Sequence, residues 1–343
     1  MNTARHHSPR SASAPSAARR DTPPGLGGSA PRGTGWTARL RRRPGLHRGA
    51  DRGRRAVTAA VLGLLVLAGA GGLTACATAG PRSLLDDIRD GHVVLGTKFD
   101  QPGLGQRTPD KTFTGLDTEV SRYVVDFIAD RNGWARPELT WRETPSAQRE
   151  TLIKNGEVDM IAATYSINAG RLKAVDFAGP YLVTHQALLV RRDSGIRGLA
   201  DIRPGMRLCS VSGSTPAQKV KDALPQVQLQ EFDTYAACAE GVHQGVVDAL
   251  TTDATILAGF AAGYGDEFSV VQLTKDDGTF WTNERYGIGL PKGDDRVRTA
   301  VNEALEDMHD SGAFAGMVRR NLGTAVDLGG KPAIGDLSFA APK

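Results

Sequence analysis

From Leu84 onward, short apolar runs alternate with longer segments whose apolar residues recur every three or four positions. Val93–Gly96 is a short apolar run typical of a buried strand, whereas the apolar positions within Asp117–Asp130 follow helical spacing. This alternation predicts an α/β fold with largely parallel sheets. Further strands are expected at Leu139–Arg142, Met160–Thr164, Arg207–Val211, Val227–Phe232, Ala249–Thr252 and Tyr286–Leu290, and further helices at Ser146–Lys154, Thr215–Leu224, Thr234–Gln244, Asp253–Ala262, Asp294–Asp310 and Ala313–Leu322.

The length of this pattern, about 250 residues, is sufficient for two hydrophobic cores of ordinary domain size. We expect a discontinuous first lobe formed by residues 84–186 and 287–325, an inserted second lobe formed by 187–286, and a C-terminal tail at 326–343. The chain should cross between the lobes near Gln186–Arg191 and Glu284–Leu290. A cleft between two α/β lobes is a common ligand site, and hinge closure over the ligand is the expected motion.

The charge of the chain is distributed unevenly. Residues 1–55 contain thirteen arginines, no lysine and two aspartates, a net charge of +11, whereas the whole chain carries +4. Subtracting the first value from the second leaves −7 for the remainder. The basic segment is rich in Ser, Pro and Gly and is predicted to be disordered. The part that can fold is therefore acidic, and we exclude nucleic acid as a partner.

An uncharged apolar run, Ala56–Leu73, follows two arginines and precedes Thr74, Ala75 and Cys76. This order is that of an export signal, with a basic region, an apolar region and small residues before a cleavage point. The alternative is a retained transmembrane helix, since 18 residues almost span a bilayer. Leu73-Thr74-Ala75-Cys76 resembles the bacterial lipobox, which implies cleavage within 56–75, a linker at 76–83 and lipidation of Cys76. One acyl chain binds a membrane only marginally, so stable anchoring requires several on this cysteine.

The remaining cysteines, Cys209 and Cys238, lie in the part predicted to be outside the cell, where disulfides persist. We expect a bridge between them, with two unpaired buried thiols as the alternative. Its loop of about 30 residues would stabilise the fold by roughly 3–4 kcal/mol on the chain-entropy model.

Catalytic and metal-binding patterns are missing from the sequence. There is no H-E-x-x-H, G-x-S-x-G or Walker sequence and no Cys/His cluster at metal spacing. The histidines after the signal are scattered: His92, His185, His243 and His309. We therefore expect a protein that is not an enzyme and that needs neither a metal nor another cofactor.

The run Gly115-Leu116-Asp117-Thr118-Glu119-Val120 resembles the signature of the family 3 extracellular solute-binding proteins, which serve polar amino acid ABC importers. By their position at a helix start, Asp117 and Glu119 suit the positive end of the helix dipole and are read as structural. The resemblance covers about residues 83–323 and is greatest to the glutamate/aspartate-binding members. It implies a two-lobed periplasmic-binding-protein-like fold of type II. The other segments that carry it are 96–103, 163–167, 171–177, 211–216 and 251–253.

The family resemblance also implies a ligand site. Members of the family place an arginine, five residues after a Ser or Thr, on the ligand α-carboxylate, and the matching residues are Ser166 and Arg171. An acidic residue for the α-ammonium matches Asp253, which by its position could also be a helix N-cap. The planar guanidinium suits bidentate carboxylate binding. The remaining residues expected around the ligand backbone are Thr164, Gly213, Ser214 and Thr215, the last three at a strand-to-helix turn.

Side-chain selectivity is assigned to Lys98 and Arg149, with Ser146 beside them, because the aspartate/glutamate-binding relatives carry basic residues there. Two buried cations would favour an acidic ligand over a neutral one. The alternative is that Arg149 is an exposed helix residue. The family pattern between Ser/Thr and Arg is usually Thr-Asp-Glu, whereas this chain has Asn168-Ala169-Gly170, a difference expected to affect the helix start more than the ligand.

The resemblance thus implies a lipid-anchored, monomeric receptor of an ABC importer, acting outside the cytoplasm and binding L-glutamate and also L-aspartate. Its partners would be a pair of transmembrane permease subunits with an ATPase. Binding of glutamine or another polar amino acid is an alternative. Two alternatives of other classes are an amino acid sensor for a signalling pathway and an exported enzyme similar to cyclohexadienyl dehydratase.

Overall fold

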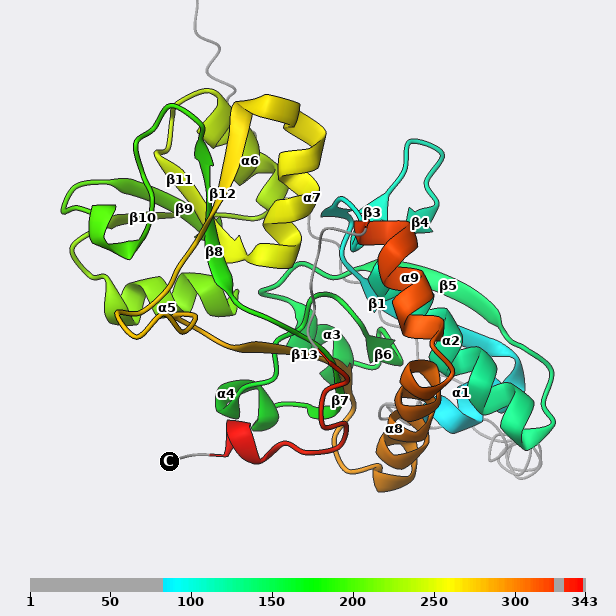
Figure 1. Cartoon of the computed structure of the whole chain (residues 1–343). Coiled ribbons are helices and arrows are strands. Elements are labelled where there is room, and N and C mark those ends of the chain that lie inside the picture. The colour runs from blue at the N-terminus through cyan, green and yellow to red at the C-terminus, as the bar shows by residue number, and fades with distance from the viewer. Residues whose placement is uncertain (1–82, 324–329, 342–343) are drawn as a thin grey trace, which may run out of the picture. The chain divides into compact units, whose positions relative to one another are not determined.

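The structure, a computed structural model, describes residues 83–323 and 330–341 (Figure 1). The predicted basic segment 1–55, the signal 56–75, the lipidation site Cys76 and the linker up to residue 82 lie outside the described residues. Among the helices of the described part, none combines the length and the apolar character that a membrane crossing requires.

The first sheet has the strand order β5-β1-β6-β13-β7. Helices α1 and α2 contact β1, and α8 contacts β7. We call this sheet and the elements that cover it the first lobe (Figure 1). The strands are β1 (His92–Thr97), β5 (Glu138–Glu143), β6 (Met160–Ile161), β7 (Asp176–Thr184) and β13 (Glu284–Leu290), and the helices are α1 (Leu84–Asp90), α2 (Leu116–Asn132), α3 (Arg149–Lys154), α4 (Ala169–Leu172), α8 (Asp295–Asp310) and α9 (Ala313–Leu322).

The second sheet has the order β10-β9-β11-β8-β12, and helices α5, α6 and α7 contact its strands. We call this group the second lobe (Figure 1). Its elements are β8 (Gln186–Arg191), β9 (Arg207–Val211), β10 (Gln228–Phe232), β11 (Ala249–Asp253), β12 (Phe268–Gln272), α5 (Thr215–Ala223), α6 (Tyr235–His243), α7 (Ala254–Tyr264) and the short 3₁₀ turns η1 (Leu199–Asp201) and η2 (Gly265–Glu267). The disulfide Cys209–Cys238 joins β9 to α6, with the two Cα atoms 5.8 Å apart, so this prediction is confirmed.

The expectation of largely parallel sheets was wrong for the strands nearest the crossings. β13 pairs antiparallel with β6 and β7, and β8 pairs antiparallel with β11 and β12. Parallel neighbours need a crossover that returns the chain to the same end of the sheet. β7 carries the chain out of the first sheet, through the single residue His185 into β8, and β13 brings it back, so the neighbours β7 and β13 run in opposite directions. Both sheets are consequently mixed.

Several local details also differ from the predicted elements. The strand expected at Met160–Thr164 ends at Ile161, because Thr164 adopts a left-handed backbone conformation with φ 47°. The helix expected from Ser146 begins at Arg149, after a turn that follows Pro145. A third small sheet, not predicted, forms between the first strand and α2. Its strands are β2 (Asp100–Gln101), β3 (Gly105–Arg107) and β4 (Phe113–Thr114).

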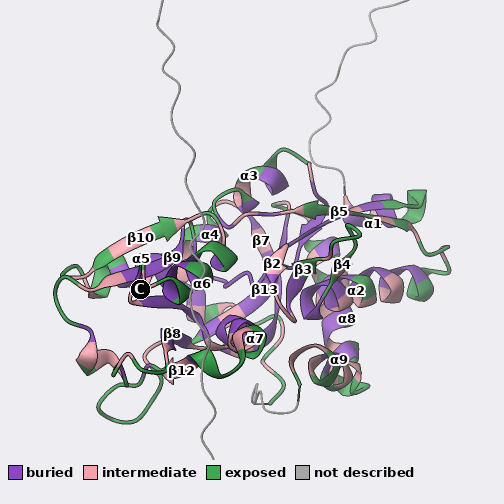
Figure 2. Cartoon of the chain, turned by 90° about the horizontal axis from the view of Figure 1, so that it is seen from above, coloured by how far each residue is buried: buried purple, intermediate pink, exposed green. Residues whose placement is uncertain are grey.

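The core follows the apolar pattern from which the elements were predicted. Figure 2 shows buried residues along the central strands and exposed residues on the outward faces of helices such as α2. Within α2, the fully buried residues include Val120, Val124 and Ile128, spaced one helical turn apart. The described end of the chain also packs on the first lobe, where Ala340, in the 3₁₀ turn η3 (Ser338–Ala340), is buried against Ile153 and its neighbours.

Candidate binding site between the lobes

Arg171 extends from α4 in the first lobe to the second lobe. The Asn168 side chain accepts a hydrogen bond from the Arg171 backbone N–H at 2.9 Å, so the unusual Asn starts this helix as an N-cap. The Arg171 guanidinium donates to the carbonyl of Ser166 at 2.6 Å and to that of Gly213 at 3.1 Å. A guanidinium has five N–H donors, so these two bonds do not exhaust it. Glu150 lies 3.4 Å from its Nε, and burial lowers the pKa of Arg171 to about 10.

The turn between β9 and α5 is in direct contact with the first lobe. Gly213 has φ +73°, and a Cβ atom there would lie 2.7 Å from the Cα of Ala147, so both the backbone conformation and the contact require glycine. Ser214 caps α5 by accepting from the backbone N–H of Ala217 at 3.2 Å. The hydroxyl of Thr215 accepts from the Asn168 side chain across the lobes at 3.4 Å.

Asp253 ends β11 and is almost completely buried. One of its carboxylate oxygens accepts from the Tyr286 hydroxyl at 2.6 Å, and the other has no hydrogen-bond partner among the described residues. It occupies the N-cap position of α7, but its side chain makes no capping bond, so that expected role is wrong. Burial, followed by the nearby Glu284 carboxylate, raises the pKa of Asp253 to about 8.

Lys98 and Arg149 are both buried, which rules out an exposed position for Arg149. The Lys98 ammonium has no hydrogen-bond partner in the described part of the chain, and its nearest carboxylate oxygen, on Asp100, is 3.8 Å away. Burial lowers the pKa of Lys98 to about 8. Arg149 donates to the carbonyls of Ser146 at 3.3 Å and Ala163 at 3.0 Å. The backbone carbonyl of Ser146 thus helps to position the Arg149 side chain.

Asp117 has a structural role that the sequence did not reveal. One carboxylate oxygen accepts from the backbone N–H of Thr164 at 2.8 Å and the other from the hydroxyl of Tyr181 at 2.6 Å. The first of these bonds holds the backbone of Thr164, which has a left-handed conformation. The Thr164 hydroxyl donates to the side-chain oxygen of Gln101 at 3.2 Å. Burial raises the pKa of Asp117 to about 6. Its position at a helix start suggested only an interaction with the helix dipole.

The predicted cations lie close together. The guanidinium carbons of Arg149 and Arg171 lie 4.1 and 4.9 Å from the centre of the same Tyr165 ring, and the charge of Arg149 adds to burial in lowering the pKa of both Lys98 and Arg171. Several of these and neighbouring side chains have a buried polar atom without a hydrogen-bond partner in the described residues, namely Lys98 Nζ, Asp100 Oδ1, Gln101 Nε2, Gln186 Oε1 and Asp253 Oδ1. Gln101 and Gln186 had no sequence signal, because isolated glutamines are common on protein surfaces.

A model of the bacterial extracellular solute-binding proteins of family 3 matches residues 93–324. This chain belongs to that family. The family prediction is confirmed, and membership implies an extracytoplasmic location for the folded part.

Two relatives of this family 3 protein are similar over nearly their whole length. The glutamate-binding protein GluB of Corynebacterium efficiens is 57% identical over 283 residues, covering 82% of this chain and 96% of the relative. GluB of Corynebacterium glutamicum is 58% identical over 284 residues, covering 82% and 95%. The glutamine-binding protein GlnH of Bacillus subtilis is 31% identical over 236 residues, covering 68% and 82%.

Solved structures confirm the two-lobed type II fold. An ancestral amino acid-binding protein, AncCDT-1, described as a precursor of cyclohexadienyl dehydratase, matches with a TM-score of 0.61 and 25% identity, covering 70% of this chain and 100% of that one. A solute receptor for L-cysteine of Neisseria gonorrhoeae matches with a TM-score of 0.63 and 21% identity, covering 70% and 94%.

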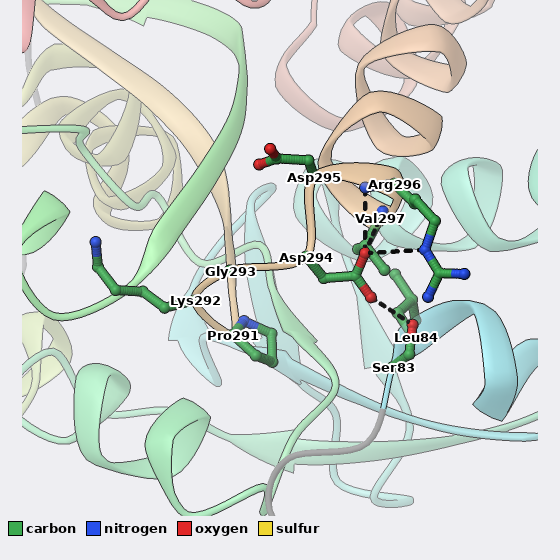
Figure 3. A pocket seen from close by; sticks show the side chains of 9 residues that line it. All are labelled: Ser83, Leu84, Pro291, Lys292, Gly293, Asp294, Asp295, Arg296 and Val297. Carbon is green, nitrogen blue, oxygen red and sulfur yellow. Dashed lines mark hydrogen bonds and ion pairs between the residues drawn. The ribbon is translucent and has the colours of Figure 1, made fainter.

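A separate surface pocket of this family 3 protein lies at the start of α8 (Figure 3). There, Asp294 accepts from the backbone N–H groups of Arg296 and Val297 and from the Ser83 hydroxyl. Its carboxylate is thus occupied in capping α8, and none of the predicted ligand residues lines this pocket. No group of His, Cys, Asp and Glu side chains suited to a metal ion occurs in residues 83–323 or 330–341.

Proposed function

We propose that this chain is the receptor of an ABC importer and binds L-glutamate, and also L-aspartate, between its two lobes. The observation that carries the proposal is the arrangement of buried charge. Arg171 and Arg149 lie against the same Tyr165 ring, Lys98 is buried beside Asp100, and one Asp253 oxygen has no hydrogen-bond partner among the described residues. An acidic amino acid has two carboxylates and one ammonium, which matches this set.

The nearby carboxylates do not remove this preference. Asp117 and Asp100 are both hydrogen-bonded to backbone N–H groups and are therefore partly compensated. A neutral glutamine side chain would leave the Lys98 ammonium buried without an anionic ligand partner. Such an unpaired charge costs several kcal/mol. The names of the two relatives at 57% and 58% identity support the same ligand.

Titration calorimetry with the four acidic and amide amino acids tests this proposal. We expect the purified chain to bind glutamate, with glutamine weaker by about 100-fold or more. Equal or tighter binding of glutamine would contradict the assignment of the ligand. Turnover of prephenate or arogenate, assayed in the same preparation, would instead identify an enzyme. Glutamate uptake that persists after deletion of the gene would favour a sensor over an importer receptor.

The proposal includes anchoring through Cys76, because a receptor outside the cytoplasm must remain near its permease. The apolar segment before Cys76 and the lipobox-like residues support it. Incorporation of labelled palmitate into the wild-type chain, and its loss in a Cys76→Ser variant, is the expected result. Equal labelling of both chains would contradict it. The receptor is expected to act as a monomer with a transmembrane permease pair and an ATPase.

A further inference from the structure

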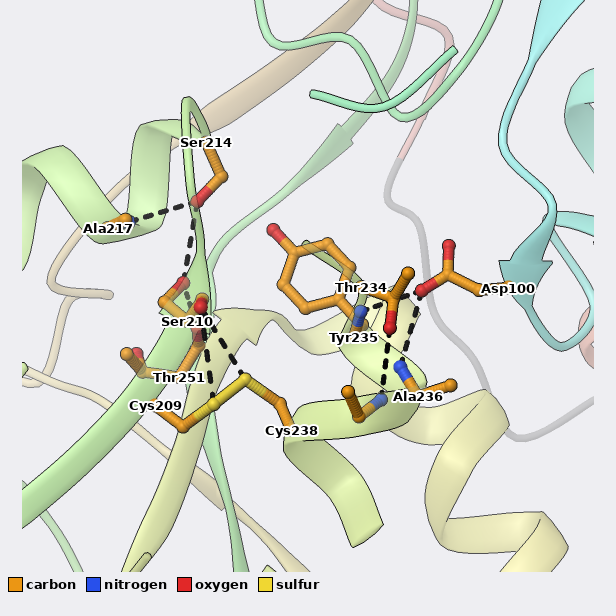
Figure 4. The surroundings of a disulfide bond; sticks show 11 residues. Asp100, Cys209, Ser210, Ser214, Ala217, Thr234, Tyr235, Ala236, Cys238 and Thr251 are labelled. Carbon is orange, nitrogen blue, oxygen red and sulfur yellow. Dashed lines mark hydrogen bonds between the residues drawn. A yellow bond between two sulfur atoms is a disulfide. The ribbon is translucent and has the colours of Figure 1, made fainter. Parts of the chain in front are cut away.

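Asp100 comes three residues after β1 of the first lobe and binds the second lobe. It lies in β2, and one of its carboxylate oxygens accepts from the backbone N–H groups of Tyr235 at 2.7 Å and Ala236 at 3.3 Å, at the start of α6 (Figure 4). Thr234 caps the next N–H of this helix, on Ala237, at 3.2 Å. The side chains of Asp100 and Thr234 together therefore satisfy the first turn of α6.

The second oxygen of Asp100 faces the ligand site. It lies 3.8 Å from the Lys98 ammonium, too far for a hydrogen bond, and has no hydrogen-bond partner among the described residues. The Tyr235 ring centre lies 5.6 Å from the same ammonium. The contact with α6 thus holds the Asp100 carboxylate close enough to interact electrostatically with the Lys98 ammonium, but too far away to accept a hydrogen bond from it.

We propose that Asp100 is a specificity-determining residue that acts through Lys98. Its negative charge partly neutralises the ammonium and so limits the preference for a carboxylate over an amide side chain. Its bonds to α6 join the two lobes, so separating the lobes would break them, and in the present arrangement they hold this charge beside Lys98. The inference rests on the proposed function, in which the ligand side chain binds at Lys98.

Two variants separate the charge of Asp100 from its bond to α6. Asp100→Asn keeps an oxygen that can accept from the α6 N–H groups but removes the charge. We expect the ratio of glutamate to glutamine affinity, measured by calorimetry, to rise about 10-fold. Asp100→Ala also loses the bond between the lobes, so the ratio should rise as it does in Asp100→Asn, with each affinity about 10-fold below its value in Asp100→Asn. Asp193→Asn, in a side chain that is 88% exposed, is the control and should leave the ratio unchanged.

A double-mutant cycle with Lys98→Met tests whether Asp100 acts through Lys98. In that background, Asp100→Asn should no longer change the ratio. An unchanged ratio in both single variants, or an equal effect with and without Lys98, would overturn the inference. A merely structural role would lower both affinities equally and leave the ratio constant. If the unaltered chain binds no glutamate, the proposed function fails first, and that result is distinguishable from failure of this inference.

Discussion

The two lobes approach each other closely at Gly259 in α7. A Cβ atom at this position would lie 2.3 Å from the carbonyl oxygen of Pro102 and 3.2 Å from its carbonyl carbon. Ordinary contacts between carbon and a carbonyl oxygen are about 3.3–3.6 Å. A Gly259→Ala chain can therefore close only if the lobes separate by about 1 Å at this point.

That separation breaks neighbouring bonds between the lobes. The bond from Tyr235 to Asp100 is 2.7 Å long and would exceed the range of a hydrogen bond. A hydrogen bond to a charged group contributes about 1.5–3 kcal/mol. Loss of one such bond, together with weaker contacts around Arg171, should make the free energy of glutamate binding less favourable by about 2–3 kcal/mol. We expect glutamate affinity to fall about 30- to 150-fold. The substitution itself stabilises a helix by about 1 kcal/mol, so the ligand-free melting temperature should not fall.

Calorimetric titration and thermal unfolding of the same samples measure both effects. Gly263→Ala is a matched control, because it lies in the same helix and its Cβ would have no atom within 4 Å. It should give the same gain in helix stability with unchanged affinity. Glutamate affinity in Gly259→Ala equal to that of the control would refute the steric argument.

Three further predictions concern other parts of the site and fold. Arg171→Ala should abolish measurable binding of every amino acid, since it removes the cation assigned to the α-carboxylate; unchanged glutamate affinity by calorimetry would contradict that role. The pKa of Asp253 is raised to about 8, above its unfolded value of about 3.9, so this carboxyl opposes folding increasingly as pH rises from about 4 to about 8. The ligand-free melting temperature should therefore fall more steeply over this range in the unaltered chain than in Asp253→Asn, and parallel curves would exclude the effect. Replacing Cys209 and Cys238 by serine should lower the free energy of unfolding by about 3–4 kcal/mol in urea titrations. A midpoint equal to that of the oxidised unaltered chain would rule this out.

Many of the elements could be predicted from sequence, because they depend on neighbours a few residues apart, but β7 and β12 were not predicted. β9 (Arg207–Val211) and α9 (Ala313–Leu322) have the predicted limits. Apolar spacing decides which face of such a segment is buried, whatever it packs against. The resemblance of the chain's motifs to a known family indicated the family, and the predicted location outside the cell indicated the disulfide. The apolar spacing did not show the short strands β2, β3 and β4, whose polar and glycine-rich residues carry no alternating pattern.

The sequence by itself determined the type of many elements and the chemical nature of the candidate ligand residues. Only the tertiary structure decided which of these groups meet. Asp117 was read as a helix-start residue, yet it holds Thr164, 47 positions later. Asp100 binds α6, 135 positions later, and Gly259 meets Pro102. The physical reason is that hydrogen bonds and close contacts act over a few ångströms in space, and the approach of two separately formed lobes, which no local pattern records, sets those distances.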